Sequence, residues 1–551
     1  MSALAAPRIN DKREIFGWAM YDWAISAFST TVGTVFLGPY LAALARAAAD
    51  ASGMVYVLGV PIAPGSFLPY CISISVGMQA MFLPMLGAVA DYSNQRKNML
   101  MFFAVLGGVA TTLLYFVQGG LWWLGGLLYV LANLSYGAAI VFYNAYLPEI
   151  ASPDQRDRVS SFGWGIGYLG GGLLLLLNLI LYTLSELGHL EQILGPDSVG
   201  LAVRINLGSA GIWWLGWQLI TFSRLSQRQV TRALPPGENY LTIGYMQLGR
   251  LMQVPTWWVA LLSLLPLATP VLVLLGLPIW LAVLPILGPL GVLVIFLVRK
   301  YPVMPQTVKY LVAYLFFNDG VQTVIGVAAI FGAEELKLEQ GTLIQVILMV
   351  QFVAFGGALL FGRLADRFGA QRALMGSLVV WSAVSIYAYQ FLTDALQFWL
   401  LGAVIALVLG GSQALSRSLF AQMIPATQEA EFYGFYEISE RGTSWWGTLL
   451  FGLVNQIYGS MRLAILSTIV FFIVGLIILP FVNVDAAIAD AEELRGVTGS
   501  VAAPARRLRN AGADAAHAEW QSPRQLKDQQ QPARKALALK DSDADKHFKD
   551  Q

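Results

Sequence analysis

Apolar stretches of about twenty residues, nearly free of charge, recur along this chain and limit what it can fold into. Residues 98–118, 342–361 and 462–482 are three of them, and each can cross a hydrocarbon layer of about 30 Å as a helix. These stretches lack the polar outer face that a helix of a soluble core needs. With 57% hydrophobic and 12% charged residues, the sequence predicts an all-α polytopic membrane protein.

Twelve apolar stretches of spanning length are expected, six in each half of the chain. In the first half they cover residues 17–44, 68–90, 98–118, 121–147, 162–184 and 204–222. In the second half they cover residues 308–332, 342–362, 373–393, 396–421, 434–457 and 462–482. The sequence therefore predicts two six-helix bundles, over 17–222 and 308–482, preceded by a cytoplasmic N-terminus over 1–16.

The predicted bundles are joined by a linker over 223–307 and followed by a tail over 483–551. Within the linker, residues 257–298 contain no charged side chain and are long enough for two more spans. Five prolines interrupt them, so a re-entrant or surface-lying hairpin is an alternative. The tail mixes charged residues with Gln, Ala and Pro, which predicts a disordered segment.

Basic residues between the predicted spans gather on one side of the membrane. The connections on that side carry Arg96, Lys97, Arg156, Arg158, Arg224, Arg228, Arg232, Arg299, Lys300, Lys309, Arg367 and Arg372. The opposite connections carry few, among them Arg46, Arg204, Lys337 and Arg462. Because basic loops stay in the cytoplasm, both termini are expected there.

A short charged motif occurs once in each half, between the second and third span of that half. The first copy, GAVADYSNQRK at 87–97, contains Gly87, Asp91, Arg96 and Lys97. The second copy, GRLADRFGAQR at 362–372, contains Gly362, Asp366, Arg367 and Arg372. Six-span halves repeated in parallel orientation are typical of one large transporter architecture, in which the substrate site lies between the halves.

These two motifs resemble the G-x-x-x-D-(R/K)-x-G-(R/K) signature of the Major Facilitator Superfamily. The second copy fits the pattern, whereas the first has Tyr92 in place of the base and Asn94 in place of the glycine. The resemblance implies a twelve-helix major-facilitator fold. It also implies that the aspartate of the motif holds the cytoplasmic gate closed, so the eight motif residues are predicted to be gating residues.

A narrower resemblance rests on YDWAISAF (21–28), NAYLPEIASPDQRDRVSSFGWGIGYLGG (144–171), NDGVQTVIG (318–326) and QALSRSLFAQMIPATQEAEFYGFYEISERGTSW (413–445). These stretches are similar to the branch that contains the vacuolar amino-acid effluxers linked to autophagy. The branch implies export of neutral amino acids, chiefly for its fungal members. Ile25 stands where the branch commonly has Asn. The chain looks like a bacterial member, which implies an inner-membrane location.

Two aspartates lie inside predicted spans, where a charge is costly. Asp22 begins a stripe with Ser26, and Asp319 begins a similar stripe with Gln322 and Thr323. We expect the two stripes to face one another across a central cavity and to bind substrate or a proton. The alternative for each acid is a structural ion pair or a helix cap.

Further polar residues lie in the later spans. Gln413 and Arg417, one turn apart, are predicted substrate or proton residues. Arg417 could bind a substrate carboxylate through two hydrogen bonds, or it could pair with Asp319 or Glu437. Glu437 and Arg441 are four residues apart, a spacing that allows a gating or structural ion pair.

Other small and polar positions suit packing as well as binding. Asn144 is predicted to be a substrate or proton residue, although polar stripes such as Asn133, Tyr136 and Asn144 often only join helices. Gly163, Gly167 and Gly171 form a ridge of small residues for close helix packing. The tryptophans, such as Trp122, Trp123, Trp213, Trp214, Trp257 and Trp258, are interpreted as interfacial anchors.

The sequence argues against several other functions. One cysteine (Cys71), three scattered histidines and the absence of G-x-S-x-G or H-E-x-x-H argue against a catalytic or metal site, so no enzyme activity, cofactor or metal is expected. The net charge of +1 points to no nucleic-acid partner.

The expected partners are a small solute, the bilayer and protons. The protein is expected to be a monomer. No ATP-binding loop occurs, so a gradient would supply the energy. The sequence thus predicts a secondary transporter of small polar solutes such as amino acids, working in efflux by alternating access. The alternative is a facilitator-like fold that does not transport and acts as a receptor, scramblase or assembly partner.

Overall fold

The computed structural model describes most of the chain between residues 9 and 498. Positions 58, 228–233, 235–238, 240–241, 254–287, 427 and 442–444 lie outside the described part, as do 1–8 and 499–551. The chain divides into two compact units, Met1–Arg495 and Gly496–Gln551. The first unit holds all the long helices.

The N-terminal half of this unit, called the N-half, is almost entirely helical. Its helices are α1 (Lys12–Ala27), the π-helix η1 (Phe28–Phe36), α2 (Leu37–Ala47), α3 (Phe67–Tyr92), α4 (Arg96–Leu113), α5 (Trp122–Ala145), α6 (Leu147–Ile150), α7 (Arg156–Glu186), α8 (Glu191–Leu194) and α9 (Ser198–Arg224). Single 3-10 turns cover Pro64–Ser66, Leu114–Phe116 and Gly119–Leu121. Between α2 and α3, the strands β1 (Val55–Val57) and β2 (Val60–Ile62) form an antiparallel hairpin.

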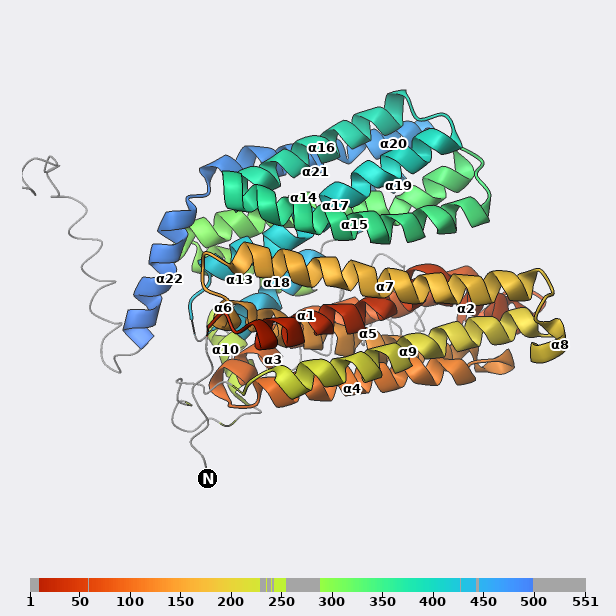
Figure 1. Cartoon of the computed structure of the whole chain (residues 1–551), viewed down its shortest axis with the longest axis horizontal. Helices are drawn as coiled ribbons and strands as arrows, with labels where there is room; N and C mark the ends of the chain where they lie inside the picture. The colour runs from red at the N-terminus through yellow and green to blue at the C-terminus, as the bar shows by residue number, and fades with distance from the viewer. Residues whose placement is uncertain are drawn as a thin grey trace, which may run out of the picture. The chain divides into compact units, whose positions relative to one another are not determined.

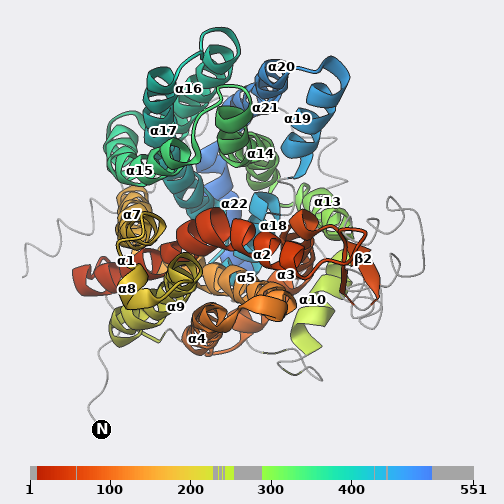
Figure 2. The same cartoon turned by 90° about the vertical axis from the view of Figure 1, so that its right-hand side faces the viewer.

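The C-terminal half, called the C-half, repeats the pattern after two connecting helices. The connecting helices are α10 (Thr242–Met252) and α13 (Gly288–Lys300). The C-half contains α14 (Pro305–Glu334), α15 (Gln340–Phe368), α16 (Ala370–Gln390), α17 (Ala395–Met423), α18 (Glu429–Arg441), α19 (Trp445–Tyr458), α20 (Met461–Ser467), α21 (Ile469–Ile478) and a 3-10 turn, Leu479–Phe481. Helix α22 (Val484–Thr498) follows. Figures 1 and 2 show the halves side by side.

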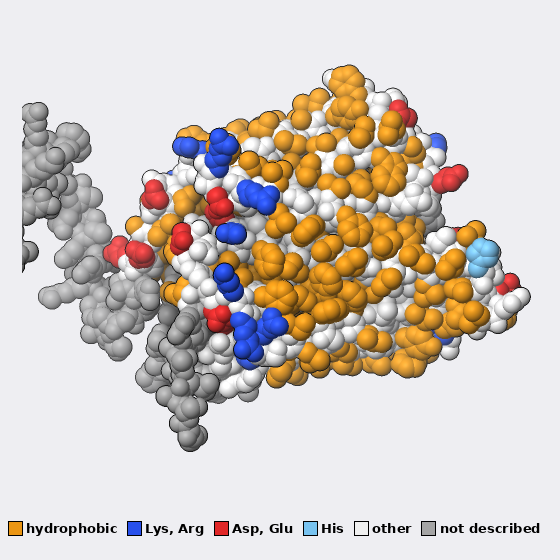
Figure 3. Space-filling model, in the orientation of Figure 1, with side chains coloured by type: hydrophobic (Ala, Val, Ile, Leu, Met, Phe, Trp, Pro, Cys, Tyr) orange, Lys and Arg blue, Asp and Glu red, His pale blue; other side chains and the backbone are white. Residues whose placement is uncertain are grey.

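Ten helical segments of the described residues are long and apolar enough to cross a membrane. They coincide with ten of the twelve predicted spans. The other two predicted spans, 204–222 and 434–457, correspond to α9 and to the pair α18 and α19, which are helical but do not meet that criterion of length and hydropathy. An apolar belt covers the middle of the face in Figure 3, with charged side chains at both ends. The prediction of an all-α polytopic membrane fold is confirmed.

Local sequence explains where several helices begin and end. The side chains of Asp11 and Asp394 accept hydrogen bonds from the first-turn amides of Arg13 (2.8 Å) and Gln397 (2.9 Å), and so cap α1 and α17. Gly369 separates α15 from α16 with φ = +87°, a conformation that favours glycine. The first charged motif has Asn94 at the matching place, and there three residues, 93–95, separate α3 from α4.

The helices alternate in direction, so the loops that carry most basic residues lie at one end of the bundle. This end, called the basic end, carries Arg96, Lys97, Arg156, Arg158, Arg224, Arg367 and Arg372 at helix termini. Lys and Arg side chains gather at this end in Figure 3. The two halves meet through the helix pairs α3–α18, α7–α15 and α7–α17.

The linker is described only in part, and the tail differs from the sequence prediction in one place. Residues 288–298 of the uncharged stretch belong to α13, which begins at the edge of the described part; residues 257–287 of the predicted insertion lie outside the described part. The tail was predicted to be disordered from 483, but residues 484–498 form α22, with Ala487 and Ala491 buried. Residues 499–551 lie outside the described part.

Candidate functional site

A cavity of about 470 Å³ lies between the two halves. The N-half contributes α1, η1, α3, α5 and α7 to its wall, and the C-half contributes α14, α15, α17 and α18. Six of the seven predicted substrate or proton residues line it: Asp22, Ser26, Asn144, Gln322, Gln413 and Arg417. The polar stripe on α1 therefore faces the cavity, as expected.

An ion pair between Asp22 of α1 and Arg417 of α17 joins the halves at the cavity wall. Arg417 Nη1 lies 3.2 Å from Asp22 Oδ2, and the Tyr143 hydroxyl donates to the same oxygen at 2.6 Å. Arg417 also donates through Nε to Ser160 Oγ (2.9 Å) and through Nη2 to the Ser160 carbonyl (2.8 Å). The predicted alternatives, a pair with Asp319 or Glu437, are wrong for this structure, since the partner is Asp22.

Three aromatic rings surround the Arg417 guanidinium. Its Cζ atom lies 4.8 Å from the ring centre of Trp18, 5.6 Å from that of Tyr143 and 5.4 Å from that of Trp164. Ring faces attract a desolvated cation, so these rings help to hold a buried charge. No sequence pattern separates these tryptophans from interfacial anchors; the interfacial interpretation is wrong for Trp18 and Trp214, which are fully buried.

The glycine ridge of α7 allows this close arrangement. A Cβ atom at Gly163 would lie 2.7 Å from Asp22 Oδ2 and 3.0 Å from Arg417 Nη2. A Cβ atom at Gly167 would lie 2.9 Å from Ser26 Oγ. The ridge packs α7 against α1, which agrees with the predicted close helix packing, and it leaves room for the ion pair.

Asp319 does not lie where the sequence analysis placed it. Gln322 lines the cavity, but Asp319 and Thr323 do not; they face Gly447 of α19. The prediction that both polar stripes face the cavity is therefore wrong for Asp319 and Thr323. Residues four apart share one helix face, but the neighbour of that face is decided by packing in the folded chain.

The first charged motif bridges the halves at the basic end. The Asp91 carboxylate accepts hydrogen bonds from the backbone N–H groups of residues 430–431 (3.1 and 2.8 Å), at the N-terminus of α18. It also pairs with Arg96 at 2.7 Å. Arg96 in turn pairs with Glu149 (2.7 Å) and Glu429 (3.3 Å). The sequence analysis missed these two acids, which lie outside the motif.

Two more residues of the first motif have separate roles. Gly87 lets α3 approach α18, because a Cβ atom there would collide with the backbone of Ala430. Lys97 donates to the Leu225 carbonyl at 2.6 Å, within the N-half.

The second charged motif makes few contacts. Asp366, Arg367 and Arg372 are exposed and form no ion pair within the described residues. Gly362 contacts the other half, since a Cβ atom there would lie 2.9 Å from Ser161 Cβ. The two copies therefore differ in this conformation.

The pair predicted on α18 is only partly described. Glu437 is buried and accepts a hydrogen bond from Asn144 Nδ2 at 3.3 Å, across the two halves. It also lines the cavity, as does Glu440. The side chain of Arg441 lies outside the described part.

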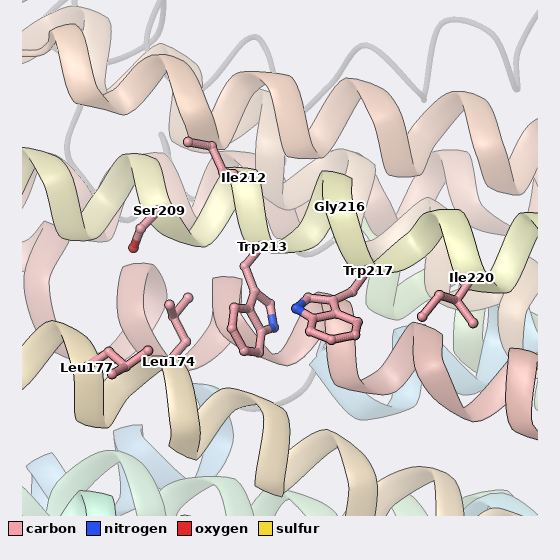
Figure 4. A pocket seen from close by; sticks show the side chains of 8 residues that line it. All are labelled: Leu174, Leu177, Ser209, Ile212, Trp213, Gly216, Trp217 and Ile220. Carbon is pink, nitrogen blue, oxygen red and sulfur yellow. The ribbon is translucent and has the colours of Figure 1, made fainter.

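A second hollow lies on the lipid-facing side of the N-half, between α7 and α9. Figure 4 shows its lining, with Trp213 and Trp217 beside Leu174 and Ile220. It carries no charged side chain, so it suits lipid contact better than a polar solute. Among the described residues, no group of three His, Cys, Asp or Glu side chains could hold a metal.

Solved transporters share this architecture. The proton:xylose symporter XylE matches with a TM-score of 0.57 and 11% identity, covering 85% of this chain and 94% of that one. The transporter FucP in its outward conformation matches with a TM-score of 0.54 and 10% identity, covering 86% and 98%. The fold is that of the major facilitator transporters.

Sequence comparison gives the family. The model of the family described as vacuole effluxer Atg22 like matches residues 10–257 and 292–492, and the chain belongs to that family. An uncharacterized MFS-type transporter, YxiO of Bacillus subtilis, is 29% identical over 466 residues, covering 84% of this chain and 94% of YxiO. Autophagy-related protein 22-1 of Penicillium rubens is 24% identical over 599 residues, covering 88% and 92%. The family match leaves out 258–291, most of the predicted insertion.

Proposed function

We propose that this protein is a secondary transporter that moves small zwitterionic solutes such as amino acids by alternating access, in the direction of efflux. The observation that carries the proposal is the cavity between the halves, with Arg417, Asp22 and Glu437 in its wall. A zwitterion needs a cationic and an anionic partner in one cavity, and this wall offers both. The description of the family, vacuole effluxer Atg22 like, supports the direction of efflux.

The side chains of the Asp22–Arg417 ion pair can exchange partners when cargo enters the cavity. A cargo carboxylate can take the position of the Asp22 carboxylate on the guanidinium, because Arg binds carboxylates with two parallel hydrogen bonds. Asp22 then needs another partner, either the cargo ammonium group or a proton. Binding of cargo would in this way loosen a contact between the halves.

The cross-half contacts at the basic end support the assignment of a conformational state. Asp91, Arg96 and Glu429 hold α3 against α18 there. We infer that this is the state closed at the basic end, and that this end faces the cytoplasm with both termini, in the inner membrane of a bacterium. Transport then requires these contacts to break so that cargo can enter from the cytoplasm.

The direct test is transport by the purified full chain in liposomes. Liposomes loaded with a mixture of amino acids are followed by mass spectrometry, with and without a pH gradient. We expect release or exchange of at least one amino acid above the rate in protein-free liposomes. Arg417→Gln should abolish it, whereas Glu191→Gln, an exposed acid on α8, should not. Wild-type protein that moves no amino acid under any gradient would refute the proposal.

A further inference from the structure

Helix α14 contains a buried carboxylate that the central cavity does not use. Asp319 is 1% exposed, and neither of its carboxylate oxygens has a hydrogen-bond partner. One turn later, Thr323 is fully buried and its Oγ1 atom also has no partner. Three orphaned oxygens therefore lie on one face of α14. Buried polar groups without partners are costly, so their presence needs a reason.

These oxygens face the first turn of α19. The backbone amide of Gly447 faces Asp319 without meeting hydrogen-bond geometry. A Cβ atom at Gly447 would collide with Thr323 Oγ1 and lie 3.2 Å from Asp319 Oδ2. Because glycine stands at this position, the first turn of α19 lies against the three oxygens without a side chain between them.

No cation of the described residues balances Asp319. Neighbouring α19 and α21 contain no charged residue, and Arg417, the only charged residue of α17, pairs with Asp22. On α15 the charged residues are Arg363, Asp366 and Arg367, all exposed at the basic end. Helix α18 presents the acids Glu437 and Glu440, and α14 itself has Lys309 ten residues before Asp319; the Arg441 side chain lies outside the described part.

We propose that Asp319 and Thr323 bind a monovalent cation, H⁺ or Na⁺, at the α14–α19 interface. All three candidate ligand atoms are oxygens, which suits a hard cation or a proton. The site is separate from the cargo cavity, so cargo and coupling ion bind to different residues. The coupling role rests on the proposed transport function, whereas the cation site itself does not.

Asn318 connects this site to the cargo cavity. Its Oδ1 atom accepts from Gln413 Nε2 at 3.1 Å, and its Nδ2 atom donates to the Glu440 carbonyl at 3.1 Å. Gln413 and Glu440 both line the cavity. A cation that moves α14 relative to α19 would therefore act on two cavity residues through one side chain.

The first test measures ion binding without any cargo. The melting temperature of the purified full chain is compared in sodium, potassium and choline salts, and at acidic and mildly alkaline pH, because a ligand of the folded state raises it. We expect the wild type to respond to Na⁺ or to pH, which distinguishes the two ions. Asp319→Asn should lose this response, and Asp22→Asn should keep it. Thr323→Val should weaken a sodium response that Thr323→Ser keeps.

Gly447→Ala provides a second variant that retains the carboxylate but places a methyl group against Thr323 Oγ1 and Asp319 Oδ2. It should lose the response as Asp319→Asn does, even if the latter is poorly folded. A wild type that responds to neither Na⁺ nor pH overturns the proposal. The proposal is also overturned if Asp319→Asn keeps the response to Na⁺ or pH while its melting temperature falls equally in every salt. Asp319 would then only cap the N-terminus of α19.

The second test concerns coupling and uses a transported amino acid. Asp319→Asn should retain exchange of cargo between equal pools but lose accumulation driven by the ion gradient. Accumulation equal to that of the wild type would overturn the coupling role. If the wild type transports no amino acid, the proposed function fails, but the melting experiment still decides whether the cation site exists.

Discussion

Arg417 illustrates how a single residue can carry a charge inside a membrane protein. Its side chain is buried, yet an acid, a hydroxyl, a carbonyl and three rings surround it. A buried ion pair adds little net stability, but removal of one partner leaves an uncompensated charge. The Asp22–Arg417 pair is therefore stable while both partners are present, and loss of either partner destabilises the folded protein.

The first prediction concerns this pair. Arg417→Gln should lower the free energy of unfolding by about 3–5 kcal/mol, because the buried Asp22 carboxylate loses its counter-charge. The double variant with Asp22→Asn should recover part of this loss. Chemical denaturation in detergent measures both. The half-buried pair Glu335–Arg462 is the control, since Glu335→Gln should cost about 1 kcal/mol or less. Equal losses for the two pairs would contradict the argument.

The second prediction compares the acids of the two charged motifs. Asp91→Asn removes the charge that pairs with Arg96 and faces the N-terminus of α18, so it should weaken the closed basic end and slow transport. The half-saturating cargo concentration should change little, since Asp91 does not line the cavity. Asp366→Asn, at the exposed equivalent position, should leave the closed state unchanged. Initial rates at several cargo concentrations test this; a large loss of affinity in Asp91→Asn would count against it.

At the scale of elements, α3 and α18 form a close crossing between the halves. Gly87 of α3 lies against the backbone of Ala430, and Gly434 of α18 lies against the backbone of Leu83 and Pro84. The connecting helices brace this pair: Gln247 of α10 donates to the Tyr92 hydroxyl at 2.7 Å, and Phe296 of α13 stacks on Phe435 at 3.7 Å. The linker thus contacts both helices that must separate.

The third prediction tests this crossing. Gly87→Ala adds a methyl group where no space exists and should destabilise the closed state by about 1–3 kcal/mol. In a chain with Cys71→Ser, a thiol introduced by Ser161→Cys reports the opening, because position 161 is buried against Gly362. Gly87→Ala should speed its labelling by a maleimide. Gly376→Ala on α16, where a Cβ atom has no neighbour, should not. Unchanged labelling in Gly87→Ala would show that the crossing can relax.

The sequence predicts the elements better than their contacts. Apolar stretches and their spacing predict the helices because each span must satisfy its own backbone. The same reasoning placed Asp22 and Arg417 at the cavity, since charges in spans face the interior of a bundle. It could not tell that Asp319 faces α19, nor that Trp18 stacks over Arg417, because both depend on which helix becomes the neighbour of a given face.

For the whole molecule, the repeated halves are unequal in this state. The repeat in the sequence suggests two equivalent gating motifs, but Asp91 is fully buried in a network between the halves, whereas Asp366 is exposed. The difference follows from α18, whose N-terminus meets Asp91. The repeat in the sequence thus identifies equivalent positions in the two halves. The conformational state determines which of these positions form contacts between the halves.

The fourth prediction tests whether the halves separate at the basic end during transport. Ser161 of α7 and Gly362 of α15 belong to different halves, and a Cβ atom at Gly362 would lie 2.9 Å from Ser161 Cβ. After a small relaxation, two cysteines there can form a disulfide. In the Cys71→Ser background, the chain with Ser161→Cys and Gly362→Cys should lose transport on oxidation and regain it on reduction. Each single variant should be insensitive to the oxidant. If the cross-linked chain transports at the uncrosslinked rate, the halves do not part at this end, and alternating access between them cannot be the mechanism.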